Sequence, residues 1–138
     1  MITGITFSCF DLLHAGHILM LKEAKRHCDY LICGLQTDPS IERPQKNKPV
    51  QSLFERYVQL NAVGVVDEVI PYTYEVEIID ILLSLKPDVR FLGSDYRDVN
   101  PDLITGMGTC RLNGIEVIYL SRDHGFSSSE LRRRIKGN

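Results

Sequence analysis

The segment 2–28 constrains the fold of this chain more than any other part of it. Residues 2–7 form an apolar run with the composition of a strand, and from Ile18 to Cys28 apolar residues recur at helical spacing. Residues 30–35, Tyr-Leu-Ile-Cys-Gly-Leu, are a second apolar run, as expected for a strand buried on both faces. A strand, a helix and a second strand in this order predict a βαβ unit with parallel strands.

The rest of the chain continues this alternation. Apolar runs at 68–71, 89–92 and 116–120 predict three further strands, and the segment 97–113 between the last two is less regular. Strands that alternate with helices favour a parallel sheet covered on both faces. The pattern therefore predicts a single α/β domain over residues 1–138.

Two helix starts are marked by their capping residues. Ser52 with Glu55, and Ser127 with Glu130, match the capping box, in which the two residues satisfy each other's backbone amides. We expect the first of these helices to run to about residue 62 and the second to about residue 136. Residues 75–85 carry apolar side chains at spacings of three and four, which predicts another helix.

Composition and charge exclude several classes of protein. The formal net charge of −2 argues against a general affinity for nucleic acid. No apolar run approaches the roughly 18–20 residues that a membrane-spanning helix needs, so we expect no membrane partner and a cytoplasmic protein. The four cysteines show no CxxC pairing, so neither a zinc site nor a disulfide framework is indicated.

Two histidines stand where the first strand passes into the first helix. His14 and His17 are three residues apart, so they share a face once the helix begins. The carboxyl ends of parallel strands form the ligand crevice of such a sheet, and a helix N-terminus there attracts anions. Ala15 and Gly16 are small, which lets a phosphate approach the backbone. This junction is therefore a candidate phosphate site.

The same junction carries a family resemblance. Residues 10–17, Phe-Asp-Leu-Leu-His-Ala-Gly-His, resemble the HxGH signature of the cytidylyltransferase branch of the nucleotidyltransferase superfamily. Residues 122–129, Arg-Asp-His-Gly-Phe-Ser-Ser-Ser, resemble that branch's Arg-x-x-Gly-[Ile-like]-Ser-[Ser/Thr] element, and the two motifs bracket nearly the whole chain. The resemblance implies a Rossmann-like domain whose five parallel strands are ordered 3-2-1-4-5.

The resemblance also implies an activity. It is closest to the glycerol-3-phosphate cytidylyltransferases, which implies transfer of CMP from CTP to a phosphorylated alcohol such as sn-glycerol 3-phosphate, for cell-envelope or capsule polymers. Two alternatives within the superfamily stay open. Residues 93–96, Gly-Ser-Asp-Tyr, also resemble the adenylyltransferase domain that activates heptose 1-phosphate with ATP, and other relatives use phosphoethanolamine or phosphocholine. An alternative of another class is a nucleotide-sensing or interaction module without turnover.

Site residues are carried over from the motifs. The catalytic residues implied by the resemblance are His14, His17, Lys46 and Arg122. The residues implied to bind the nucleotide also include Ser8, Cys9, Phe10, Gly16, Gly93, Asp95, Gly125, Phe126, Ser127, Ser128 and Ser129. The residues considered for substrate binding are Asp11, Lys48 and Arg56.

Several of these roles have competing interpretations. Lys48 competes with Lys46 as the loop lysine that reaches a phosphate. Asp11 can orient the backbone or a neighbouring donor, and a turn-capping role fits it equally. Arg56 can reach a phosphate or pair with a helix carboxylate. Cys9 stands where the family usually has threonine or serine, and a thiol is a weaker hydrogen-bond donor.

The acceptor, the metal and the oligomeric state are less defined. Relatives that act on glycerol 3-phosphate tend to carry a basic residue near the start of the third helix, and this chain has none there. Arg90, Arg97 or the loop 43–48 would then have to hold the acceptor phosphate. Triphosphate chemistry implies Mg²⁺ bound mainly through phosphate oxygens, with no protein ligand assigned. The resemblance further implies a homodimer.

Overall fold

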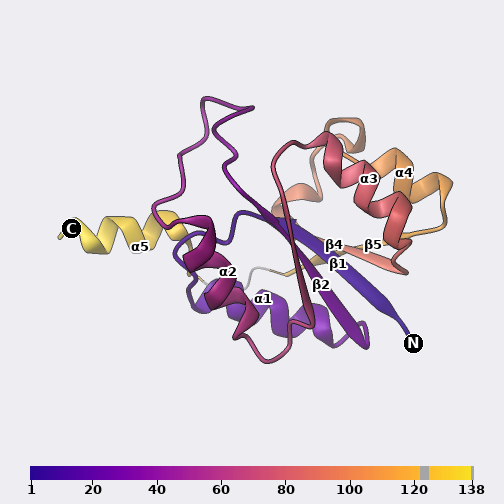
Figure 1. The fold of residues 1–138 in the computed structure, drawn as a ribbon, viewed down its shortest axis with the longest axis horizontal. Helices are drawn as coiled ribbons and strands as arrows, with labels where there is room; N and C mark the ends of the chain where they lie inside the picture. The colour runs from indigo at the N-terminus through magenta and orange to yellow at the C-terminus, as the bar shows by residue number, and fades with distance from the viewer. Residues whose placement is uncertain (122–124, 138) are drawn as a thin grey trace.

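The computed structural model of the chain describes residues 1–121 and 125–137. It contains one sheet of five parallel strands in the order β3-β2-β1-β4-β5, which confirms the expected α/β fold and strand order (Figure 1). The strands are β1 (Thr3–Ser8), β2 (Tyr30–Gln36), β3 (Glu68–Tyr72), β4 (Val89–Gly93) and β5 (Glu116–Leu120).

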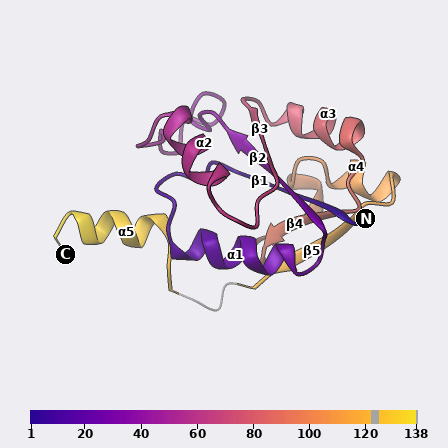
Figure 2. The ribbon, with the colours of Figure 1, turned by 60° about the horizontal axis from the view of Figure 1, so that its bottom comes forward.

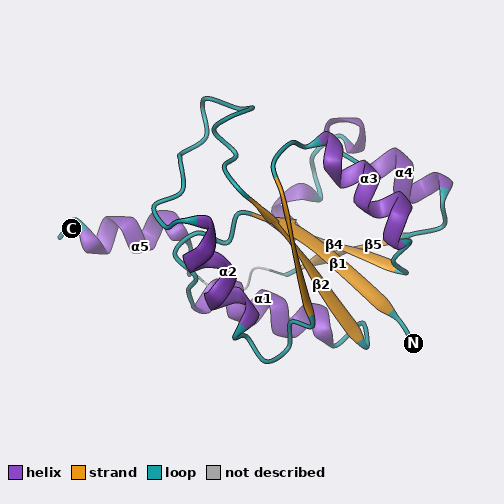
Figure 3. Cartoon of the chain, in the orientation of Figure 1, coloured by secondary structure: helices purple, strands orange, loops and turns teal. Residues whose placement is uncertain are grey.

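Helices cover both faces of this sheet. In Figure 3 one pair, α1 and α2, lies on one side of the strands and the other pair, α3 and α4, on the opposite side. The last helix, α5, leads away from the sheet in both Figure 1 and Figure 2. The helices are α1 (Ala15–Lys25), α2 (Leu53–Asn61), α3 (Val76–Leu85), α4 (Met107–Leu112) and α5 (Ser128–Ile135).

Each face of the sheet has its own hydrophobic core. Leu21 of α1 and Leu60 of α2 pack in one cluster with strand residues such as Leu31. Ile78 of α3 packs in the other cluster, which contains Ile32, the next residue along β2. Neighbouring residues of β2 thus enter opposite cores, because successive side chains of a strand point to opposite faces. This double burial explains the uninterrupted apolar runs in the sequence.

The helix boundaries agree with the sequence where local signals set them. Ser52 and Glu55 form the expected reciprocal capping box at the start of α2. At α5 only half of the expected box is observed: Ser127 Oγ accepts the amide of Glu130, but the Glu130 carboxylate bonds to Arg133. The second capping-box prediction was therefore correct for the helix start and wrong for the acidic side chain.

The irregular segment after β4 contains three short elements. A 3₁₀ turn, η1 (Ser94–Tyr96), follows β4 directly, and a second, η2 (Pro101–Leu103), has Pro101 in its first turn. α4 begins after Gly106, whose φ of 85° lies in the left-handed region that glycine adopts without strain. A Cβ at this position would lie 2.8 Å from Leu82, so α4 packs closely on α3.

The topology places the candidate site. All five strands are parallel, so their carboxyl ends meet at one edge of the sheet. β1 lies between β2 and β4, and the direction of strand order reverses there. Ligands of open α/β sheets bind outside the carboxyl ends at such a switch point. The segment that follows β1, which carries both histidines, therefore begins at the expected ligand crevice.

Candidate active site

A cleft of about 660 Å³ lies along the carboxyl edge of the sheet. It is lined by the end of β1, the start of α1, part of the loop before α2, the end of β4 and the start of α5. The sequence-predicted residues that line it are Ser8, Cys9, Phe10, Asp11, His14, Gly16, His17, Lys46, Gly93, Asp95, Phe126, Ser127, Ser128 and Ser129. The two motifs at opposite ends of the chain thus share one cleft.

Three predicted residues lie outside the lining of the main cleft, and a fourth is not described by the structure. Gly125 lines a smaller adjoining cavity of about 300 Å³, which shares His14 and Phe126 with the main cleft. Among the residues that the structure describes, Lys48 and Arg56 are not part of the lining of the main cleft. Arg122 lies outside the described residues, so its predicted role stays a prediction.

The two histidines form the N-terminal cap of α1. His14 is the N-cap residue, and its Nδ1 accepts the amide of Gly16 at 3.0 Å. Nδ1 of His17 accepts the amide of His14 at 3.2 Å, which closes a reciprocal capping box. The sequence predicted the shared face of these residues but not this capping role, because histidine is an unusual residue in a capping box.

The cap determines which nitrogen of each imidazole carries the proton. Because Nδ1 of His14 and of His17 accepts a backbone N–H, the neutral ring holds its proton on Nε2. The two ring centroids lie 4.0 Å apart, and the ring of Phe10 lies 5.7 Å from that of His17. The site therefore presents two imidazole N–H donors beside the amides of a helix N-terminus, a combination suited to phosphate oxygens.

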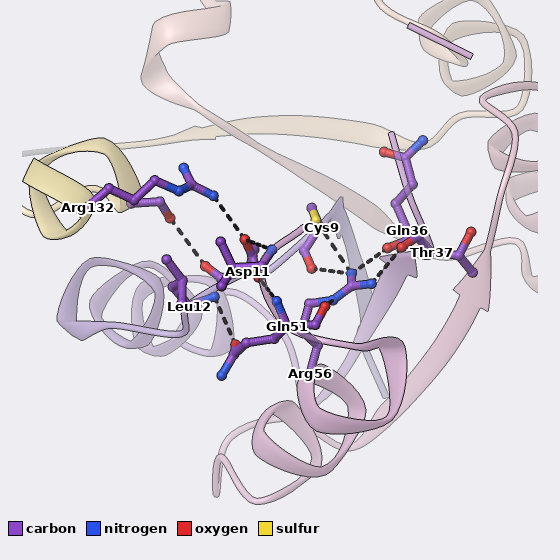
Figure 4. A network of polar contacts seen from close by, with 10 residues as sticks. Cys9, Asp11, Leu12, Gln36, Thr37, Gln51, Arg56 and Arg132 are labelled. Atoms are coloured by element: carbon purple, nitrogen blue, oxygen red, sulfur yellow. Dashed lines mark hydrogen bonds and ion pairs between the residues drawn. The ribbon is translucent and has the colours of Figure 1, made fainter. Parts of the chain in front are cut away.

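Asp11 joins the β1–α1 turn to two other segments (Figure 4). Its carboxylate, 7% exposed, accepts the amides of Val50 at 2.8 Å and Gln51 at 3.0 Å, and Arg132 Nη2 at 2.9 Å. Its carbonyl accepts the hydroxyl of Ser128 at 3.2 Å. Asp11 thus binds both backbone amides and a neighbouring donor, Arg132, and its direct contact with substrate stays a prediction.

These contacts hold the start of α5 against the histidine turn, the segment between β1 and α1 that contains Asp11 and His14. Arg132 of α5 and Ser128 at its N-terminus both bind Asp11. Sequence reasoning missed Arg132, because its charge belongs to a basic run of three arginines that is equally typical of a solvated helix face. The spacing of four residues between Ser128 and Arg132, one helical turn, is the signal that could have paired them.

Arg56 occupies a buried position beneath the same turn (Figure 4). Only 2% exposed, it donates from Nη1 to the carbonyls of Cys9 at 3.0 Å and Gln36 at 2.7 Å. Nη2 donates to the carbonyl of Thr37 at 2.5 Å, and Nε to that of Gln51 at 3.1 Å. The observed partners are backbone carbonyls in place of the considered helix carboxylate, and contact with a phosphate stays a prediction.

Cys9 is a neutral thiol in this setting. Burial raises the pKa of the Cys9 thiol, and the positive charge of Arg56 only partly opposes this shift. Its Sγ also lies 3.4 Å from Nη1 of Arg56. Cys9 therefore offers the cleft a weak S–H donor where the family usually offers a hydroxyl.

The structure separates the two loop lysines that the sequence left as competitors. Lys46 is exposed and lines the cleft, and its amide donates to the carbonyl of Arg43 at 2.8 Å. Lys48 lies near Asp38, where its charge contributes to lowering the pKa of that carboxyl, after the larger effect of the Ser40 hydroxyl. The cleft-facing position favours Lys46 as the residue that reaches a nucleotide phosphate.

Substitution of each lysine gives a matched test. We expect Lys46→Ala to weaken nucleotide binding about tenfold or more, because a charge-assisted hydrogen bond contributes roughly 1.5–3 kcal/mol. Lys48→Ala should change the nucleotide affinity by less than about threefold, since exposed charge pairs contribute roughly 0–1 kcal/mol. Calorimetric titration of both variants with nucleoside triphosphate measures the difference, and equal losses would contradict the assignment.

The described residues contain no group of three His, Cys, Asp or Glu side chains placed to hold a metal ion. The predicted Mg²⁺ therefore stays a prediction. None of the described helices is long and apolar enough to cross a membrane.

Sequence relatives cover almost the whole chain. It is 34% identical over 136 residues to bifunctional protein HldE of Paramagnetospirillum magneticum, a match that covers 98% of this chain and 27% of the relative. Bifunctional protein HldE of Campylobacter jejuni strain RM1221 is 36% identical over 132 residues, covering 95% of this chain and 27% of the relative. The chain thus spans about a quarter of the length of the curated relatives it matches.

Solved structures share the fold. The lipopolysaccharide core biosynthesis protein of Thermoplasma volcanium superposes with a TM-score of 0.74 at 26% identity, covering 90% of this chain and 99% of that one. Pantothenate synthetase of Thermus thermophilus superposes with a TM-score of 0.67 at 14% identity, covering 99% of this chain and 64% of that one. The second likeness concerns the fold alone.

The family match agrees with the geometry of the cleft. A model of the cytidylyltransferase-like family matches residues 5–134 and so includes both the histidine motif and the serine motif. Between them these motifs supply two helix N-termini, two imidazoles and three serines around one cleft. This chain therefore belongs to the cytidylyltransferase-like family of nucleotidyltransferases.

Proposed function

We propose that this protein transfers a nucleotidyl group from a nucleoside triphosphate to a phosphate oxygen of a small acceptor. The observation that carries the proposal is the convergence of the two motifs on Asp11: the serine helix binds it through Ser128 and Arg132, directly beside the turn that holds His14. Two helix N-termini that face one cleft form a cradle for several phosphates in a row.

The proposed reaction needs positioning and charge stabilisation more than covalent chemistry. An oxygen of the acceptor phosphate attacks the α-phosphorus of the nucleotide, the bond to the bridging oxygen of the β-phosphate breaks, and pyrophosphate leaves. Charge increases on the non-bridging and leaving oxygens. The Nε2–H groups of His14 and His17, the amides at the start of α1 and the ammonium of Lys46 are suited to stabilise it.

Mg²⁺ would enter this site with the triphosphate. Bound through phosphate oxygens, it would neutralise part of their charge and would keep most of its waters. The donor set of the cleft fits such an arrangement. Imidazole N–H groups, serine hydroxyls and Lys46 are donors to phosphate, while the carboxylate of Asp11 is already bonded to two amides and to Arg132.

For the substrates we propose ATP and a sugar phosphate such as heptose 1-phosphate, with an ADP-sugar as product. The HldE relatives and the Gly-Ser-Asp-Tyr sequence at 93–96 support this alternative over the CTP-dependent one. The relative named for lipopolysaccharide core biosynthesis supports a role in making cell-surface sugars. CTP with sn-glycerol 3-phosphate, which the serine motif favours, is the competing pair.

A pyrophosphate-release assay with a matrix of donors and acceptors tests the proposal. We expect the largest kcat/KM with ATP and a sugar 1-phosphate, and one ADP-sugar formed for each pyrophosphate released. CTP with glycerol 3-phosphate is the matched competitor, and a larger kcat/KM for that pair would reverse the assignment. No release with any pair would favour the nucleotide-sensing module.

The setting of the reaction is proposed on the same basis. ATP and sugar phosphates are cytoplasmic metabolites, so we propose that the protein acts in the cytoplasm, and the family resemblance supports a homodimer. Light scattering of the purified chain measures the oligomeric state, and a monomer at micromolar concentration would contradict the proposed homodimer.

A further inference from the structure

Arg90 is a buried cation in the middle of the sheet. It belongs to β4, where its Cα is paired with Ile5 of β1 on one side and Val117 of β5 on the other. The residue is 3% exposed, yet it lines the cleft. An arginine is charged at neutral pH, and burying an uncompensated charge costs several kcal/mol. A buried arginine on a ligand cleft therefore requires a physical reason.

The protein supplies Arg90 with only part of what a guanidinium needs. Nη1 donates to the carbonyl of Thr105 at 2.5 Å, and the guanidinium carbon lies 5.3 Å from the centre of the Phe7 ring. Nε is buried and has no hydrogen-bond partner among the described residues. The thiol of Cys110 is a further hydrogen-bond partner of Arg90, but a sulfur is a weak acceptor, and the thiol is neutral because burial raises its pKa. The surroundings of Arg90 are thus short of acceptors and of negative charge.

A second arginine shows the same deficit in the same cleft. Arg43 reaches the cleft from the loop before α2, and its Nη2 binds Oε1 of Glu75 at 2.8 Å. Its Nε is also buried without a partner in the described part of the chain. In the described part of the chain, three buried side-chain polar atoms lack a hydrogen-bond partner, and two of them are these arginine nitrogens. The third is Oε1 of Gln59, which is on α2 and does not line the cleft.

The charges at this end of the cleft do not balance. Glu75 is the carboxylate whose charge acts on Arg90, but it is already paired with Arg43. Among Arg43, Arg90 and Glu75, one positive charge therefore remains, beside walls that include Tyr72 and Ile78. Burial lowers the pKa of Arg90, which is the expected effect of a cation held away from water without a full counter-charge. An anion with several acceptor oxygens would supply both the missing hydrogen-bond acceptors and the missing negative charge.

The place of Arg90 in the sheet separates it from the nucleotide cradle. Its Cα lies level with Ile5, three residues before the end of β1, whereas His14 and His17 follow that end. At roughly 3.3 Å per residue, this is about 10 Å below the edge of the sheet. Its long side chain shortens that distance and lies against Phe7. The two ends of the cleft therefore suit two different ligands.

We propose that Arg90, together with Arg43 on the same cleft, is the binding site for the phosphate of the acceptor. This inference rests on the proposed function, because the acceptor there carries a phosphate. The arginine neutralises and orients the attacking group from the side of α3 and α4, and the nucleotide occupies the side of α1 and α5. The sequence offers Arg90, Arg97 and the loop 43–48 for this role, and the position of Arg97, which is exposed and does not line the cleft, favours Arg90 and Arg43.

Binding measurements on the full chain test this without turnover. The triphosphate site is first filled with a non-hydrolysable ATP analogue, and inorganic phosphate or glucose 1-phosphate is then titrated by calorimetry. We expect Arg90→Met to weaken both phosphate probes tenfold or more and to leave the Kd of the ATP analogue within about threefold. Arg90→Lys keeps a charge and should recover part of the affinity. Arg97→Met is the matched control and should bind the probes normally.

The outcomes separate this inference from the proposed function. Unchanged phosphate binding by Arg90→Met, or no phosphate binding by the unaltered protein, overturns the inference even if nucleotidyl transfer is observed. If no donor and acceptor pair reacts but Arg90→Met still loses the phosphate probes, the proposed function fails and the anion site stands. Thermal unfolding of each variant shows whether it is folded, and parallel loss of ATP-analogue binding and phosphate binding would also contradict an acceptor-specific role.

Discussion

Replacing His17 with alanine is expected to lower kcat for nucleotidyl transfer by about 10²–10³. The proposed role of its Nε2–H is to stabilise charge that develops on the phosphates, and loss of one such preorganised donor in an enclosed site has effects of this size. Steady-state pyrophosphate release with saturating ATP and acceptor measures kcat. Because the donor acts mainly in the transition state, the KM for ATP should change much less than kcat.

The capping role of His17 requires a second variant. Alanine also removes the acceptor for the His14 amide, which should cost about 0.5–2 kcal/mol of unfolding free energy. His17→Gln keeps an acceptor at this position of the capping box but removes the imidazole. Its free energy of unfolding should therefore be close to that of the unaltered protein, while its kcat should stay low. His27→Ala, at an exposed histidine just beyond α1, is the matched control. Unchanged turnover in both His17 variants would show that the catalytic assignment is wrong.

The fold was predictable from sequence because its signals are local and repeated. Strand runs such as 30–35 are apolar throughout because neighbouring residues enter two different cores. The capping box of Ser52 and Glu55 needs only residues within one turn, and it formed as expected. The box of Ser127 and Glu130 was only half formed because Arg133, a neighbour on the same helix, offers the carboxylate a stronger partner than an amide.

The candidate site was predictable only where a motif marked it. Motif residues such as His14 and Ser128 line the cleft, but their contacts through Asp11 join segments more than 100 residues apart. The position of Arg90 in an apolar run shows that it belongs to a strand, but periodicity does not reveal whether its charge is compensated. Arg56 was considered for a phosphate or a helix carboxylate, but its observed partners are carbonyls from the ends of two strands and a loop, which no local pattern contains.

Replacing Arg56 with leucine is expected to lower the free energy of unfolding by about 3–5 kcal/mol. Its guanidinium donates to the carbonyls of Cys9, Gln36, Thr37 and Gln51, so it links the turn after β1 to the end of β2 and the start of α2. Leucine would leave these acceptors unsatisfied, and bonds to a charged group contribute roughly 1.5–3 kcal/mol each without being additive. Urea denaturation measures the loss, which is a large share of a typical stability of about 5–15 kcal/mol.

Two further variants separate the geometry of this clamp from its charge. Arg56→Lys keeps the charge, but a single ammonium cannot reproduce the planar fork that spans four carbonyls, so it should recover only a small part of the stability. Arg111→Leu, at an exposed position of α4, controls for loss of an arginine elsewhere and should stay within about 0.5 kcal/mol of the unaltered protein. Arg56 binds the carbonyls of Cys9 and Gln51, and Gln51 in turn bonds to Asp11 and Leu12, so the clamp also fixes the turn that precedes His14. At a low temperature at which the Arg56→Leu variant is folded, it should therefore bind ATP more weakly than the unaltered protein. Normal stability together with normal ATP binding would refute this structural role.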